Sequence, residues 1–229
     1  MDFLFLAVAF LIPVVLGFLI FLLMVRYEKK TRRVQTSFST SSIVLGAGIL
    51  SSVTAFLIRV AAMQIPFYPS NKLVSIFVIS IFAKSLPAIL VKLIIFMLVP
   101  SKNRSFGQFF NWIILISLPF ASFDFAWWIL HKDFFQAFMT CFMQGFSTIL
   151  TGYFIWSLKR YSKHFFPLIY AFILQGIFYF FISFAFPFKY ISIAAVLFAM
   201  VESRLWFVIL NEEYEKRIDK ILFNFSNSN

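Results

Sequence analysis

Seven long runs of apolar residues alternate with short polar stretches along the chain. Each run holds about 20 residues, the length that an α-helix needs to cross roughly 30 Å of hydrocarbon. Because lipid offers no hydrogen-bond partner to free backbone groups, each run is expected to be helical, and no strand is expected. The predicted spans lie near residues 3–25, 43–66, 74–99, 107–130, 134–157, 165–187 and 190–210. The pattern predicts an all-α, polytopic membrane helix bundle of about seven transmembrane helices.

The polar connections differ in charge from one side of this bundle to the other. Thirteen lysines and arginines follow the first, third, fifth and seventh runs, whereas only Lys72, Lys132 and Lys189 lie in the other connections. Cytoplasmic loops collect Lys and Arg. We therefore expect a multi-pass protein of the plasma or inner membrane, with its N-terminus outside and its C-terminus in the cytoplasm.

Short connections favour a single transmembrane bundle over residues 1–210. The first run is expected to be a retained anchor, because its positive cluster follows the apolar residues instead of preceding them. From residue 211 the apolar residues recur at helical spacing opposite charged ones. Residues 211–229 are therefore predicted to form a cytoplasmic amphipathic tail along the inner membrane surface.

Composition supports a membrane protein and limits its partners. Hydrophobic residues make up 62% of the 229 residues and charged residues 13%, with a mean hydropathy of +0.91. The net charge of +11 is spread over the predicted inner loops, with no basic domain to bind nucleic acid. Anionic lipid headgroups are the expected partner of these cations.

Ionisable residues inside the spans carry the most information, because each is costly in hydrocarbon unless it is paired or hydrated. They are Arg59, Lys84, Lys92, Asp124, Glu202 and Arg204. At ~1.5 Å per residue, Arg59 and Asp124 fall at one depth, which predicts an ion pair. Lys84 and Glu202 fall together at a second depth and could form another pair, while Lys92 is placed nearer the cytoplasm.

Two amides, Gln144 and Gln175, fall at the same depth as Lys84 and Glu202. Four polar side chains at one level suggest a shared interior pocket. Alternatively, the amides only join helices through hydrogen bonds. Cys141 is the sole cysteine, and His131 and His164 are predicted at opposite membrane faces. We therefore expect no disulfide, no metal site and no cofactor.

Four of the spans contain short motifs in a fixed order. The first, "SLPAILVKLIIF", carries Lys92, and the second, "FASFDFAWW", carries Asp124. The third begins at Gln144 in "MQGFSTILTGY", and the fourth is "QGIFY", with Gln175 at its start and Tyr179 at its end.

In this order and spacing, residues 80–185 resemble the PrsW-like glutamic-type intramembrane proteases, relatives of the CAAX-processing membrane proteases. In that family the first motif is Glu-Glu-x-x-Lys, and here Ala88 and Ile89 stand in place of the glutamates. Asp124 stands in place of a glutamate, and Gln144 and Gln175 each stand in place of a histidine. Lys92 is kept.

The resemblance implies hydrolysis of a peptide bond within the membrane by acidic and histidine side chains that activate a water. Glutamine cannot accept a proton, and one carboxylate without a matched histidine makes a poor hydrolase. We therefore expect a non-catalytic relative that binds transmembrane segments of other proteins. Two alternatives stay open: a small-molecule transporter or substrate-binding subunit that uses Lys84, Asp124 and Glu202, and a structural subunit of a membrane assembly.

Overall fold

The computed structural model describes residues 38–65, 69–99, 105–131, 133–160 and 164–226, and these residues contain helices and no strands. The elements in chain order are α2 (Phe38–Met63), α3 (Lys72–Val78), the π-helix η1 (Ile79–Ser85), α4 (Leu86–Leu98), α5 (Phe106–Leu130), α6 (Phe134–Lys159), α7 (Phe166–Ile182), the 3₁₀ turn η2 (Phe188–Tyr190) and α8 (Ile191–Ser226). The predicted all-α class is confirmed for this part of the chain.

Five helical stretches among the described residues are long and apolar enough to cross a membrane. They are Ser41–Met63, Lys72–Leu98, Phe106–Leu130, Phe134–Lys159 and Phe188–Lys220. Helix α7 coincides with another predicted span but has 17 residues. The first predicted span, residues 3–25, lies outside the described residues. The protein is therefore an apolar helical bundle of the kind found in integral membrane proteins.

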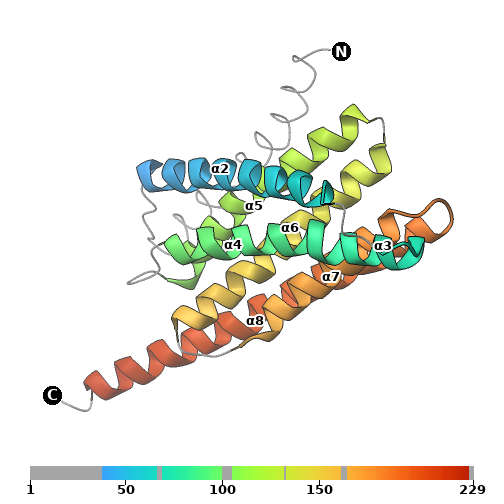
Figure 1. Cartoon of the computed structure of the whole chain (residues 1–229). Coiled ribbons are helices and arrows are strands. Elements are labelled where there is room, and N and C mark those ends of the chain that lie inside the picture. Colours follow the sequence, from blue (N-terminus) through green and yellow to red (C-terminus); the bar gives the residue numbers. More distant parts are fainter. Residues whose placement is uncertain (1–37, 66–68, 100–104, 132, 161–163, 227–229) are drawn as a thin grey trace.

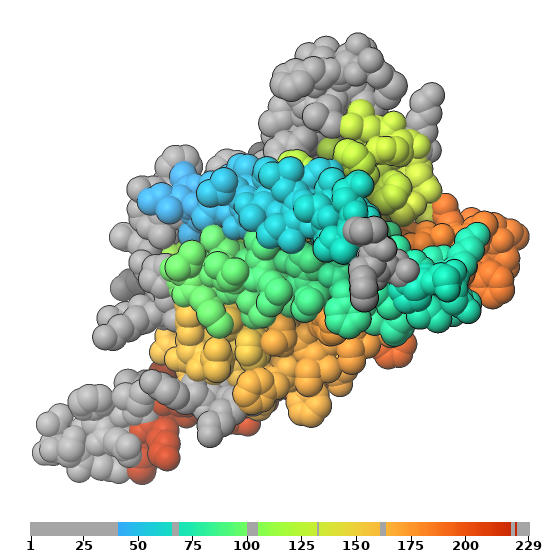
Figure 2. Space-filling model, in the orientation of Figure 1, coloured from blue at the N-terminus to red at the C-terminus, as the bar shows by residue number. Residues whose placement is uncertain are grey.

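Helix α6 lies at the centre of the bundle. It forms an antiparallel hairpin with α5 and also contacts α4, α7 and α8 (Figure 1). Helices α2 and α4 run side by side across one face (Figure 2), and α7 and α8 pack on another side of α6. Because four neighbours cover α6, its polar residues lie away from lipid.

Close approach of the helices depends on small residues. A Cβ atom on Gly152 of α6 would lie 2.5 Å from Cγ1 of Ile113 in α5. A Cβ atom on Gly48 of α2 would lie 3.2 Å from Cα of Ile116 and 3.3 Å from Cγ of Pro119 in α5. Small residues let backbones approach in this way in membrane bundles, where packing drives helix association.

A π-helical segment interrupts the long helix between Lys72 and Leu98. It ends at Ser85, two residues before Pro87. Proline lacks the N–H that a regular helix uses, and its ring clashes with the carbonyl four residues earlier. A π-helical turn accommodates this defect, and such turns are frequent at functional sites. Lys84 lies within this turn.

The two ends of the bundle are closed by different polar contacts. At one end, Asp133 caps α6 and accepts a hydrogen bond from Lys189 at 3.1 Å. At the other end, Lys159 Nζ donates to the carbonyl oxygens of Phe96, Met97 and Val99 at the C-terminus of α4. Cations stabilise such C-termini by bonding the last free carbonyls.

The predicted tail begins within a continuous helix. Residues 211–226 extend α8 without a break and project from the bundle toward the C-terminus (Figure 1). His164 Nε2 contacts Glu213 Oε1 at 2.7 Å, and Arg217 Nη1 donates to the Arg160 carbonyl oxygen at 2.7 Å. These contacts tie the start of the extension to the bundle.

Candidate functional site

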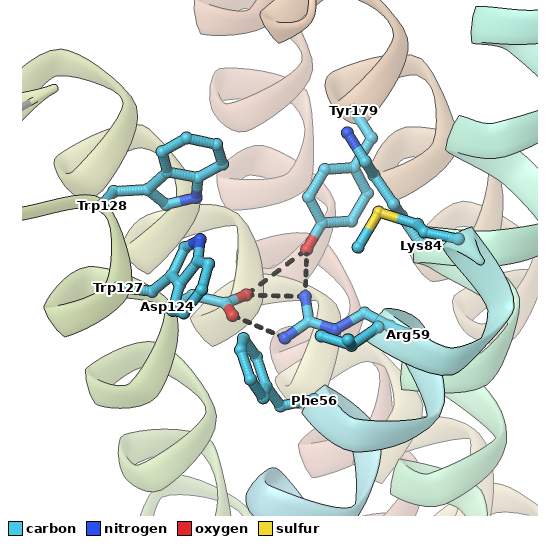
Figure 3. Close-up of a pocket in the computed structure, with 9 residues that line it drawn as sticks. Phe56, Arg59, Lys84, Asp124, Trp127, Trp128 and Tyr179 are labelled. Carbon is cyan, nitrogen blue, oxygen red and sulfur yellow. Dashed lines mark hydrogen bonds and ion pairs between the residues drawn. The ribbon is translucent and has the colours of Figure 1, made fainter. Parts of the chain in front are cut away.

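An ion pair joins α2 to α5, as the matched depths predict. Arg59 Nη2 donates to Asp124 Oδ1 at 2.5 Å, and Arg59 Nη1 donates to Asp124 Oδ2 at 2.9 Å (Figure 3). Arg59 is 8% exposed and Asp124 is 4% exposed. The geometry is the bidentate arrangement that makes guanidinium–carboxylate pairs strong.

Gln144 of α6 connects this pair to the other intramembrane residues. Its Nε2 donates to Asp124 Oδ2 at 2.7 Å and to the Tyr179 hydroxyl at 2.6 Å. Its Oε1 accepts from Lys92 Nζ at 2.7 Å and from Gln175 Nε2 at 3.5 Å. One carboxamide thus uses both donors and both acceptor sites. We call Arg59, Lys92, Asp124, Gln144, Gln175 and Tyr179 the polar network.

Lys92 is completely buried in α4, and both of its hydrogen-bond partners are neutral. Besides Gln144, its Nζ donates to Ser147 Oγ at 2.6 Å, and it lies 5.2 Å from the centre of the Phe120 ring. The sequence placed Lys92 nearer the cytoplasm than Gln144, but the two are bonded. A long side chain and the π-helical turn before α4 both shift the contact from the depth of a straight helix.

Lys84 lies beside the polar network but does not pair with Glu202. Its Nζ donates to Ser183 Oγ at 3.4 Å and lies 5.7 Å from the centre of the Tyr179 ring. Glu202 is half-buried on α8, and its Oε2 has no hydrogen-bond partner among the described residues. Helix α7 contacts both η1 and α8 and so lies between them. The suggested Lys84–Glu202 pair is therefore wrong.

A cavity of about 60 Å³ adjoins the polar network. It is lined by Phe56, Arg59, Val60, Met63, Lys84, Asp124, Trp127, Trp128 and Tyr179 (Figure 3). Met63 is 41% exposed and Trp127 is 39% exposed, so they form a rim at the surface. Apart from Lys84 in η1, the lining residues lie near the C-terminal ends of α2, α5 and α7. We call this space the Arg59 cavity.

The acid–base groups of the site are locked in hydrogen bonds. Asp124 is the only carboxylate in the polar network, and both of its oxygens face Arg59. The Lys92–Ser147 distance would suit a base and a nucleophile. However, both side chains are completely buried, and neither lines the Arg59 cavity. The Arg59 cavity therefore does not give a substrate access to Lys92 or Ser147.

The described residues offer no cluster of three His, Cys, Asp or Glu side chains that could hold a metal ion. His131 follows α5 and bonds the Trp127 carbonyl through Nδ1 at 2.8 Å, whereas His164 precedes α7. The two histidines lie at opposite ends of the bundle. Cys141 is a half-buried free thiol in α6.

Three contributors to the site lacked a clear sequence signal. Tyr179 ends the fourth motif, but nothing in its spacing predicted bonds to both Arg59 and Gln144. Ser147 and Trp127 are of types common in membrane helices, so their roles depend on helix rotation. No protein-family model, curated protein or solved structure matches the chain.

Proposed function

We propose that this chain is a non-catalytic relative of the PrsW-like intramembrane proteases, which binds transmembrane segments of other proteins. One observation carries the proposal: Gln144 uses its whole hydrogen-bonding capacity to join Asp124, Tyr179, Lys92 and Gln175. At the position where the resemblance expects a histidine, the chain has an amide that hydrogen-bonds four residues of the polar network. An amide cannot take a proton from water, so the arrangement favours a structural role over hydrolysis.

The Arg59 cavity supports recognition of a helix rather than of a soluble metabolite. Pockets for drug-sized ligands have volumes of about 300–1,000 Å³, far above the 60 Å³ found here. The rim is apolar, formed by Met63 and Trp127. A side chain from a neighbouring transmembrane helix can enter such a space without leaving lipid.

The topology we propose places this cavity near the extracellular face of a plasma or inner membrane. The cation-rich connections and Lys159 then lie on the cytoplasmic side, where anionic headgroups attract Lys and Arg. Seven transmembrane helices, counting residues 3–25, leave the N-terminus outside. Cysteine introduced at exposed Asn71 should react with an impermeant maleimide added outside intact cells. Cysteine at exposed Glu215 should react only after permeabilisation.

The binding proposal is tested with purified protein in lipid vesicles and synthetic transmembrane peptides that carry a fluorescence acceptor. Wild-type protein with a donor fused at its C-terminus should show energy transfer to a subset of peptides, and mass spectrometry should find the peptides uncut. Peptide cleavage that Asp124→Asn abolishes would reject the non-catalytic proposal.

A matched pair of variants tests whether binding uses the cavity. Val60 lines it, whereas Val53 lies seven residues earlier on the same face of α2 and is also half-buried. Val60→Trp should fill the cavity and weaken peptide binding about tenfold or more, because interface residues in filled pockets carry most binding energy. Val53→Trp should leave it nearly unchanged. Equal losses in both variants would place the binding surface elsewhere.

A further inference from the structure

Positive charge exceeds negative charge around the Arg59 cavity. Arg59, Lys84 and Lys92 lie in or beside the polar network, and Asp124 is the single carboxylate among them. Asp124 is already bonded to Arg59, Gln144 and Tyr179. A charge within a spanning helix is costly without a counter-charge, so unmatched cations indicate a functional site.

Lys84 is the donor with unused capacity at the cavity. Arg59 Nε also lacks a hydrogen-bond partner among the described residues, but this atom is fully buried and does not face the cavity. Lys84 contacts the neutral Ser183 hydroxyl at 3.4 Å, a long distance for an ammonium donor. Both side chains line the same space (Figure 3). The missing partner is therefore an acceptor, and the charge excess favours an anionic one.

The lining of the cavity narrows the chemistry of that anion. The cavity of about 60 Å³ is open at its rim, and its wall combines cations with apolar side chains. Phe56, Val60 and Met63 on one side and Trp127 and Trp128 on the other would contact an aliphatic stem.

We infer that the Arg59 cavity is a subsite for a side-chain carboxylate, supplied by an Asp or Glu within the transmembrane segment of a partner protein, and that Lys84 pairs with it. This inference rests on the proposed function and names the segments that the chain selects. The π-helical turn at residues 79–85 positions Lys84 beside Tyr179, at the cavity wall. The partner carboxylate would neutralise the cation that Asp124 leaves unmatched.

The test uses full-length protein in neutral phosphatidylcholine vesicles and Leu/Ala transmembrane peptides. One peptide carries Glu in its outer half, a second carries Gln at the same position, and a third carries the Glu in its inner half. We expect the outer Glu peptide to bind about tenfold more tightly than either control, the value of a charge-assisted hydrogen bond.

Variants of Lys84 test the pairing directly. Lys84→Met should remove the preference for Glu, while Lys72→Met, which changes an exposed cation at the start of the same helix, should keep it. Lys84→Glu should bind a peptide with Lys in the outer half more tightly than the Glu peptide. This reversal guards against a loss that arises only from misfolding, and circular dichroism of each variant checks its helicity.

The outcomes separate the inference from the proposed function. Equal binding of the Glu and Gln peptides overturns the carboxylate subsite and leaves segment binding intact. Failure of every peptide to bind overturns both. Loss of the preference in vesicles with phosphatidylglycerol would show that headgroups occupy the site. That result would reject a partner segment as the source.

Discussion

The Arg59–Asp124 pair should be the most sensitive point of the bundle to a change of charge. In Asp124→Asn the buried guanidinium loses its only contacting carboxylate among the described residues and keeps the Tyr179 hydroxyl at 2.9 Å. A guanidinium stays charged in proteins. Breaking one partner of a buried ion pair costs about 3–5 kcal/mol. We expect a loss of this size in the free energy of unfolding.

The opposite change should cost less. In Arg59→Met, Asp124 still accepts from Gln144 Nε2 at 2.7 Å and from the Tyr179 hydroxyl at 3.4 Å. The expected cost is about 1–3 kcal/mol, the range for an unsatisfied buried polar group.

The double variant Arg59→Met/Asp124→Asn removes both charges and leaves neutral groups that can bond one another. Its cost should be about 1–3 kcal/mol, well below the sum of the single costs, because neither buried charge is left uncompensated. The stability of each variant is measured by reversible unfolding in mixed micelles with increasing dodecyl sulfate, followed by far-ultraviolet circular dichroism.

Lys72→Met supplies the control, since Lys72 is an exposed cation at the start of α3. It should change the free energy of unfolding by no more than ~0.5 kcal/mol, as is usual for a surface substitution. Additive costs for Arg59 and Asp124 would refute the reasoning. So would a larger cost for Arg59→Met than for Asp124→Asn.

Two further comparisons each use a pair of residues of the same type, one closely packed or fully bonded and the other not. Gly152→Ala should destabilise the bundle by about 1–2 kcal/mol, because the new Cβ would overlap Ile113, whereas Gly145→Ala meets nothing within 4 Å and should be neutral or slightly stabilising in the same unfolding assay. Gln144→Leu should lower the free energy of unfolding by about 2–4 kcal/mol, because several buried polar groups lose their hydrogen-bond partner. Gln175→Leu should cost less than ~1 kcal/mol, since Gln175 contributes a 3.5 Å contact and has an unpartnered Oε1; similar costs for the two would contradict the central role of Gln144.

Hydrophobic run length was sufficient to locate the long helices among the described residues. A helix in lipid must satisfy its own backbone, so an apolar run of about 20 residues has one available structure. Depth along each helix also predicted the Arg59–Asp124 pair, because the rise per residue is fixed. The sequence did not predict that α8 continues without a break beyond residue 210. A helical pattern in the tail does not reveal whether the helix before it ends.

Rotation about each helix axis was not predictable from the sequence. Gln144 and Glu202 were assigned similar depths, yet Gln144 is 1% exposed at the centre of the network and Glu202 is half-buried on α8. Lys92 joined the network although its depth differed, since a lysine side chain spans several ångströms and η1 is not a regular helix. A one-dimensional depth scale contains neither rotation nor side-chain reach.

The meeting of Lys92, Asp124, Gln144 and Gln175 at one point has a physical cause that needs no shared ancestry. Lipid excludes polar side chains, so polar residues of spanning helices are driven inward whatever their ancestry. Glu202 provides the comparison within this chain, because it lies in a spanning helix but does not join the network, and its Oε2 lacks a partner among the described residues. Exclusion from lipid therefore does not by itself bring a residue to this point. Helix rotation, which turns Lys92, Asp124, Gln144 and Gln175 toward one point and Glu202 away from it, is the feature that burial alone leaves unexplained.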